Sequence, residues 1–242
     1  MRKKTLVTLT VLALASAAGF AASQDGFMVT SNGRIVITKN RPDTAATVAS
    51  SSSDPGDASL VRIFDNIGSY YPKGIYYCCQ GWTIAGPTTG QQQSFPELWE
   101  AAAFTPAADH TVTKIKVAAG WVLGVNGLVL SLYNDSGGVP GTAIRSWSLT
   151  NLPTFGCCAL QVRTDAAGIP VKAGVQYWVV LKTNSKESNT LAAWNDNDTD
   201  QLTYRKMATY CSDDKEGSCG NNDAWTTFET APAPAFAVLG SN

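Results

Sequence analysis

The chain of 242 residues carries 18 basic and 19 acidic side chains, a formal net charge of -1, and charged residues make up only 15% of it. Binding to a nucleic-acid backbone requires clustered Lys and Arg, and the sequence has no such cluster beyond positions 2–4, so we expect no nucleic-acid partner. Few charges together with many turn-forming Gly, Thr, Ser and Asn residues are typical of an extracellular β-protein.

Residues 1–23 have the pattern of a secretory signal peptide. Three basic residues at positions 2–4 precede an apolar run over 6–15, and small residues follow up to Ser23. The apolar run is shorter than the roughly 20 residues that a helix needs to cross a bilayer. We therefore expect export through a leader cleaved after Ser23, with Ala17 as the alternative, and no transmembrane anchor. Removing the three basic residues changes the formal charge from -1 to -4.

Residues 24–38 are predicted to form a short β segment in front of the main domain. The stretch 27–38, FMVTSNGRIVIT, places two apolar runs around Asn32-Gly33, a dipeptide suited to a two-residue turn because both central positions need a positive φ. We expect a hairpin here, outside the main domain. Residues 39–59 contain almost no large apolar side chain to offset their ordering entropy, so they are predicted to be a flexible linker.

Residues 60–242 alternate short apolar runs with turn signals, which predicts an all-β fold, an antiparallel β-sandwich of jelly-roll type. The expected strands are LVRIFD, WTIAG, EAAAFT, TVTKIKVA, LVLSLYN, AIRSWSL, CALQVR, VQYWVVLKT, TLAAWN, LTYRKMAT, WTTFET and AFAVLG. Over 114–117 two lysines alternate with Ile115 and Val117, which indicates a half-buried strand. The continuous apolar run 177–181 indicates a central strand that is covered on both faces.

Two further segments are assigned to connections between strands. The stretch 96–103, PELWEAAA, is predicted to be a loop leading into a strand. Its Glu97 and Glu100 would share a face only on a helix, so they do not offer the facing carboxyl pair, about 5 Å apart, that a retaining glycosidase needs. The stretch 134–141, NDSGGVPG, is a dense turn signal whose glycines are predicted to supply positive φ.

The chain has six cysteines, and export favours disulfides over free thiols or zinc thiolates. Cys211 and Cys219 enclose a short polar loop, and we expect them to form a disulfide. The other four form two adjacent pairs, Cys78-Cys79 and Cys157-Cys158.

The two adjacent pairs leave two arrangements open. Neighbouring residues on a strand point to opposite faces, so both cysteines of one pair cannot easily cross-link to both of the other. One alternative is a single bridge between the two segments, and the other is a vicinal disulfide inside each pair, which could floor a pocket beside Tyr77 and Trp82. The spacing does not fit the C-x2-C pattern of zinc sites or the C-x-x-C pattern of thiol redox catalysis.

A family resemblance is carried by a series of segments in the order FDNIG, YYCCQGWTIAGP, AAFTP, HTVTKIKVAAG, LSLYNDSGGVPGTAIRSW, NLPTFGCC, GIPVKAGVQYWVV and AAWNDNDTDQ. From about Leu60 to the C-terminus the chain resembles the bacterial choice-of-anchor R domain family. The resemblance implies an exported, cell-surface or extracellular β-sandwich of undefined molecular activity. The C-terminal AFAVLGSN lacks a hydrophobic tail and a basic stop, so we expect secretion or non-covalent surface attachment.

Aromatic residues beside turns are the candidate ligand contacts. Trp147 and Trp178 lie within apolar strands and are predicted to be core residues. Ring faces with neighbouring Asn, Asp and Gln side chains are what sugar recognition uses. The residues expected at exposed loop ends, as candidate sugar contacts, are Trp82, Trp121, Trp194 and Trp225, and Tyr77 beside the Cys78-Cys79 pair is a fifth candidate contact.

Asp196, Asp198 and Asp200 present oxygen ligands at alternate positions, as calcium loops do. An EF-hand loop that started at Asp196 would need Gly and Glu where this chain has Gln201 and Met207. A calcium site of another type and an ordinary Asx-rich turn both remain open, and we expect no other cofactor.

Catalytic residues are not indicated. His110 is the only histidine, it precedes an alternating strand, and no G-x-S-x-G motif accompanies it, so no hydrolytic triad can be assembled. The sequence therefore favours a non-enzymatic surface or extracellular module that binds carbohydrate, with glycans or other surface proteins as partners. A structural subunit assembled through the N-terminal hairpin is the alternative, and a secreted glycan hydrolase is a third, less favoured interpretation.

Overall fold

The computed structural model describes residues 22–24, 27–29, 34–37, 57–67, 80–86, 97–156, 160–184, 189–197, 204–212 and 224–242. Within these ranges the chain forms β-strands and no α-helix. The strands are β1 (Ala22–Gln24), β2 (Phe27–Val29), β3 (Arg34–Ile37), β4 (Val61–Asp65), β5 (Gln80–Ala85), β6 (Glu97–Phe104), β7 (His110–Val117), β8 (Ala119–Leu123), β9 (Gly127–Ser136), β10 (Val139–Thr150), β11 (Gln161–Val171), β12 (Tyr177–Lys182), β13 (Leu191–Asn195), β14 (Tyr204–Ser212), β15 (Ala224–Pro232) and β16 (Phe236–Ser241). This part of the chain offers no helix that is long and apolar enough to cross a membrane.

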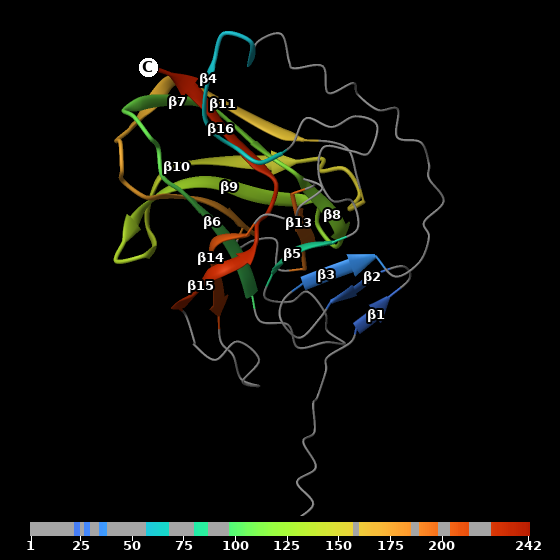
Figure 1. Cartoon of the computed structure of the whole chain (residues 1–242). Helices are drawn as coiled ribbons and strands as arrows, with labels where there is room; N and C mark the ends of the chain where they lie inside the picture. The colour runs from blue at the N-terminus through green and yellow to red at the C-terminus, as the bar shows by residue number, and fades with distance from the viewer. Residues whose placement is uncertain are drawn as a thin grey trace, which may run out of the picture.

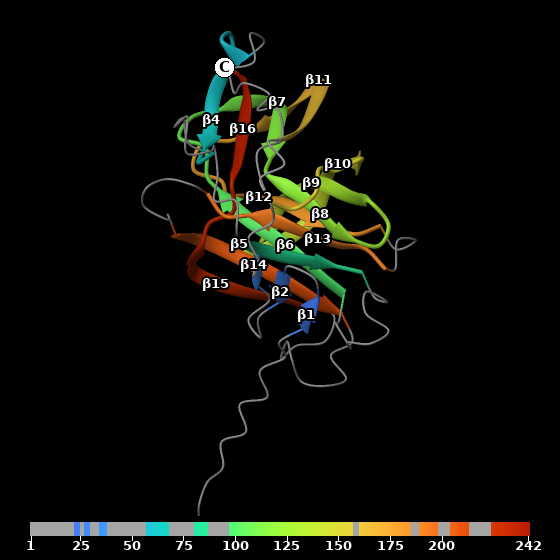
Figure 2. The same cartoon turned by 90° about the vertical axis from the view of Figure 1, so that its right-hand side faces the viewer.

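The strands form two sheets, which confirms the predicted all-β sandwich. The small sheet has four strands in the order β11-β7-β16-β4, and the large sheet has twelve. In the large sheet β6 pairs with β12 on one side and β14 on the other, β12 continues to β9 and β10, and β15 flanks β14. Strand β5 joins β3 and β13 to this array, and β8 flanks β13. The small sheet lies on one side of the large sheet, and β14 and β15 lie on the opposite side of the molecule (Figures 1 and 2).

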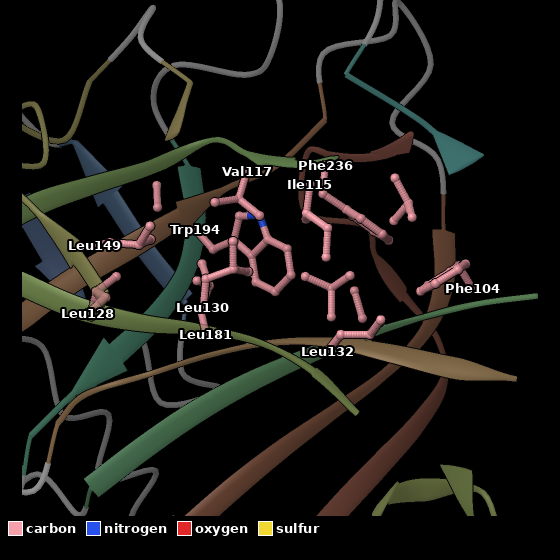
Figure 3. Close-up of a cluster of buried hydrophobic side chains, with 14 of the residues drawn as sticks. Phe104, Ile115, Val117, Leu128, Leu130, Leu132, Leu149, Leu181, Trp194 and Phe236 are labelled. Carbon is pink, nitrogen blue, oxygen red and sulfur yellow. The ribbon is translucent and has the colours of Figure 1, made fainter. Parts of the chain in front are cut away.

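The main core fills the space between the two sheets. Ile115 and Phe236 of the small sheet point toward Leu130 and Leu181 of the large sheet, with the Trp194 ring among them (Figure 3). All five side chains are 0–1% exposed. Burial of such large apolar side chains stabilises a fold by about 1.5–3 kcal/mol each, so this layer dominates the stability of the sandwich.

Strand burial follows the predicted periodicities. In β7, Ile115 and Val117 face the core, while Lys114 and Lys116 on the other side of the strand both bind Asp57. The continuous apolar strand β12 is paired on both edges and buried on both faces, as predicted. Asp57 falls within the segment 39–59 that was predicted to be a flexible linker, so that prediction is wrong at its C-terminal end.

The turn between β9 and β10 is also as predicted. Gly137 and Gly138 have φ of 66° and 91°, values that side-chain-bearing residues rarely adopt. They join Ser136 to Val139, which are paired across the two strands.

Two predictions about N-terminal and loop segments are wrong. The hairpin of β2 and β3 forms, with Phe27 opposite Ile37, but it does not lie outside the main domain, because β3 pairs with β5 and β1 adds a further strand. The stretch 97–99 is not a loop but the beginning of β6, which starts at Glu97 and continues through the predicted strand EAAAFT. Strand β8 was not predicted; its AGWVL segment pairs with β13 and places Ala119 in the core and Val122 beside a smaller cluster.

The large sheet is curled. Strands β15 and β10 stand at opposite ends of the run β15-β14-β6-β12-β9-β10, yet they contact each other. On the side of this run that faces away from the small sheet, a second group of buried side chains packs together, namely Ala101, Ala103, Tyr133, Trp178, Val180 and Ala208, with Trp225 against them. We call this side the aromatic face.

Candidate functional site

Three half-buried aromatic side chains form the centre of the aromatic face. The rings of Trp99 and Tyr210 are stacked, with centroids 4.2 Å apart and planes 22° from parallel. Trp225 stands edge-on to both, at 5.6 Å from Tyr210 and 6.3 Å from Trp99. Offset-stacked and edge-to-face pairs of this kind each contribute about 0.5–1.5 kcal/mol beyond their buried area. The group is therefore a rigid aromatic cluster that remains partly open to solvent.

Strand register explains why these three rings meet. Tyr210 lies directly opposite Trp99 of β6 on one side and opposite Trp225 of β15 on the other. Directly opposite residues point to the same face of a sheet, with Cβ atoms about 4.5–5.5 Å apart. The small side chains of Ala101 and Ala103 follow Trp99 on this face, since successive side chains alternate.

Lys182 is the cation of the aromatic cluster. Its Nζ lies 4.8 Å from the centroid of the Trp99 ring and 5.9 Å from that of Tyr133, within the range of cation–π attraction. It also donates a hydrogen bond of 3.2 Å to the Tyr133 hydroxyl. The ammonium is thus positioned on the aromatic face by ring faces and a hydroxyl.

Two carboxylates on this face, those of Glu97 and Glu229, have partners of their own. Oε1 of Glu97 accepts hydrogen bonds from Trp99 Nε1 and Thr183 Oγ1, at 2.8 and 3.2 Å. Glu229 is paired with Lys206 at 3.1 Å.

Asp135 lies beside Trp178 at the end of the aromatic face next to the β9–β10 turn. It accepts hydrogen bonds from Trp178 Nε1, Gln176 Nε2 and the backbone N–H of Gly138. Burial acts to raise the pKa of Asp135, but these hydrogen bonds and the charge of Lys206 outweigh it, so the pKa lies below its usual range. This carboxylate therefore fixes Trp178 and the β9–β10 turn in place.

A second polar group lies on the opposite, inner side of the large sheet. Arg34 of β3 forms an ion pair with Asp196, and its guanidinium lies 4.7 Å from the centroid of the Trp82 ring. Glu100 of β6 is also fully buried and accepts a hydrogen bond of 2.8 Å from Thr209 Oγ1. Oδ1 of Asp196 and Oε1 of Glu100 are buried and have no hydrogen-bond partner among the described residues.

Burial dominates the electrostatics of this inner group. It raises the pKa of Glu100 well above its usual value, because the Thr209 hydrogen bond and the Arg34 charge compensate only in part. It also raises the pKa of Asp196, against the lowering effect of Arg34. Glu97 and Glu100 fall on opposite faces of β6, so this strand does not bring the two carboxyl groups together. The inner group is covered by protein, and its evident role is to attach β3 to the sandwich.

The four tryptophans predicted to be ligand contacts differ in burial. The expectation that Trp82 and Trp194 are exposed is wrong, because their side chains are 4% and 0% exposed and their Nε1 groups donate to the carbonyls of Pro232 and Ala235. Trp121 is half-buried on β8 and donates to the Gly124 carbonyl at 3.0 Å. Trp225 is half-buried and belongs to the aromatic face.

Only some of the residues predicted for the disulfides and the calcium site lie within the described residues. Cys211 lies in β14, opposite Leu98 and Ala224. The predicted calcium ligand Asp196 is paired with Arg34. The other residues predicted for the calcium site, the ligand site and the disulfides lie outside the described residues: Tyr77, Cys78, Cys79, Cys157, Cys158, Asp198, Asp200 and Cys219. The calcium site and the disulfides stay predictions.

Sequence reasoning missed Trp99, Tyr210, Tyr133 and Lys182. For Trp99 a signal existed: in ELWEAAAF an aromatic residue alternates with alanines at every second position, the period of a strand. The segment was instead read as a loop. For Tyr210 and Lys182 no local signal marks them, because only the strand order brings β12, β6, β14 and β15 together.

No protein-family model, no curated protein and no solved structure matches this chain.

Proposed function

We propose that this protein is a non-enzymatic carbohydrate-binding module, with the aromatic face as its binding surface. The observation that carries the proposal is the cluster of Trp99, Tyr210 and Trp225 on the side of the sheet away from the core. Sugar rings present apolar C–H surfaces and hydroxyl groups, and a rigid aromatic cluster with polar neighbours complements both.

Trp225 is the ring best placed to meet a ligand. The Trp99 ring is already engaged inside the protein, by the stacked Tyr210 ring and by the ammonium of Lys182. Trp225 stands edge-on to both rings and lies on β15, where Thr227, two residues further along the strand, is exposed. We therefore assign the sugar-stacking role to Trp225 and the supporting role to the Trp99–Tyr210 stack.

A role in the extracellular space belongs to the same proposal. The basic and apolar pattern of residues 1–23 supports export, and the resemblance to the choice-of-anchor R domain family supports a cell-surface setting. Assembly into a fibre through an unpaired N-terminal strand has less support, because β2 pairs with β1 and β3, and β3 pairs with β2 and β5.

The test is a glycan array with the oxidised mature protein, followed by calorimetric titration of the best ligand with Trp225→Ala and Trp121→Ala. Trp121 is the matched control, because it is also half-buried but lies on β8. We expect Trp225→Ala to weaken binding about tenfold or more, equivalent to about 1.4 kcal/mol. Loss of its two ring contacts should also lower stability by about 1–3 kcal/mol, so binding is measured well below the melting temperature of the variant. Binding that is lost in Trp121→Ala and kept in Trp225→Ala would place the site elsewhere, and an array without any bound glycan would refute the proposal.

A further inference from the structure

The charged groups of the aromatic face are unevenly partnered. Glu97 and Asp135 accept hydrogen bonds from neighbouring donors, and Lys206 is paired with Glu229. Lys182 has no carboxylate within ion-pair distance among the residues that the structure describes, and its one hydrogen bond there goes to the Tyr133 hydroxyl. An ammonium group has three donors, so two are left for a ligand.

We infer that the aromatic face binds an acidic sugar, whose carboxylate or sulfate group is held by the ammonium of Lys182. This inference rests on the proposed carbohydrate-binding function. Lys182 is half-buried beside Trp99, so a bound anion would be partly shielded from water and its attraction to the ammonium strengthened. The rings also fix the position of the ammonium, which reduces the entropy lost when it binds.

Two features of the surroundings bear on this charge preference. Glu97 is the carboxylate beside Trp99, but its Oε1 is bound by Trp99 Nε1 and Thr183 Oγ1, and Lys182 does not pair with it. The formal charge of the whole chain is slightly negative. At physiological ionic strength exposed charges more than about 8 Å away are largely screened, so nearby groups decide the local preference. Of Lys182 and Glu97, only Lys182 offers donors to an anion, and the charge of Glu97 opposes it.

The test compares the binding of sugars that differ only in charge. The array should carry uronate oligosaccharides beside their methyl esters and sulfated oligosaccharides beside their desulfated forms. We expect the charged member of at least one pair to bind more tightly, with an affinity that falls as salt is raised from 0.05 to 0.5 M. The uronate and sulfate arms identify the anionic group.

Variants of Lys182 then assign the effect. Lys182→Met keeps the side-chain stem and removes the charge, and we expect it to weaken binding of the charged sugar roughly fivefold, the size of a part-exposed ion pair. Binding of the uncharged partner should change less, so the ratio of the two affinities should fall. Lys182→Arg should retain most of the preference. Lys172→Met is the matched control, because it also removes one positive charge. Lys172 is exposed and precedes the first residue of β12, whereas Lys182 is the last residue of that strand.

The outcomes separate the two proposals. Equal binding of charged and uncharged sugars, with loss of both in Trp225→Ala, would overturn the acidic-sugar inference and leave the carbohydrate site in place. A charge preference that survives in Lys182→Met but not in Lys172→Met would also overturn it. Absence of binding to every sugar would overturn both.

Discussion

The ion pair between Arg34 and Asp196 attaches the N-terminal strands to the sandwich, and removing it gives the most direct test of this fold. In Arg34→Met the carboxylate of Asp196, which is 0% exposed, would lose its counterion inside the protein, and the Trp82 ring would lose the guanidinium above it. Breaking a buried pair by removing one partner costs about 3–5 kcal/mol. For a chain of this size we expect the melting temperature to fall by about 6–20 °C.

The pH dependence of this loss identifies its cause. Burial raises the pKa of Asp196 even with Arg34 present, and without Arg34 the pKa should rise further. A carboxyl whose folded pKa lies above its unfolded pKa favours the folded state when protonated, so unfolding free energy falls as pH rises through that window. The penalty of Arg34→Met should therefore be largest near pH 7 and shrink as pH falls toward the ordinary Asp pKa of about 3.9.

The assay is urea unfolding followed by tryptophan fluorescence at pH 4.5 and pH 7. Arg62→Met is the control, since Arg62 pairs with Asp65 at 2.9 Å but its side chain is 68% exposed, and a surface pair of this kind should change stability little. The double variant Arg34→Met, Asp196→Asn removes both charges and should be more stable than either single variant. Equal, small effects of Arg34→Met and Arg62→Met at both pH values would refute the docking of β3 through this ion pair.

The remaining predictions concern the buried carboxyl and two glycines. Burial raises the pKa of Glu100 well above its usual value, so the stability of the wild-type protein should decline as pH rises from about 4.3. Glu100→Gln should therefore be more stable than the wild type at pH 8 but not at pH 4. A lower stability of the variant at pH 8 would contradict this. A Cβ at Gly240 would lie 1.9 Å from the Thr111 carbonyl oxygen, so Gly240→Ala should destabilise the small sheet severely in thermal melts. At Gly137 nothing lies within 4 Å and only the φ of 66° is unfavourable, so Gly137→Ala should cost only about 1 kcal/mol, and a similar loss for both glycine variants would show that the clash at Gly240 is relieved.

Local patterns were sufficient for the fold class and for most strands. The alternation of Lys114 and Lys116 with Ile115 and Val117 predicted both the strand and its buried face, because the period of two is a property of the extended backbone itself. The glycines at 137 and 138 predicted the turn because few other residues adopt their φ. These are short-range effects, and the residues that cause them are neighbours in the chain.

Long-range pairing was decided only by the tertiary structure. Nothing near Arg34 in the sequence indicates that β3 joins β5, because its partner Asp196 is 162 residues away. Likewise Trp82 and Trp194 stand beside polar turn residues, yet strand pairing carries both into the core. Their local composition suggested loop ends, and burial between two sheets is a property that no short window of sequence contains.

The aromatic face likewise depends on a local sequence pattern and on long-range strand pairing. The period of two in a strand places Trp99 on the same side of β6 as Ala101 and Ala103, a local pattern that the sequence contains although a loop was predicted at Trp99. Only the strand order, with β14 between β6 and β15 and β12 beside β6, brings Trp99, Tyr210, Trp225 and Lys182 into contact. The physical reason is that a face of a sheet is assembled across strands by backbone hydrogen bonds, whose partners are chosen by the packing of the whole domain.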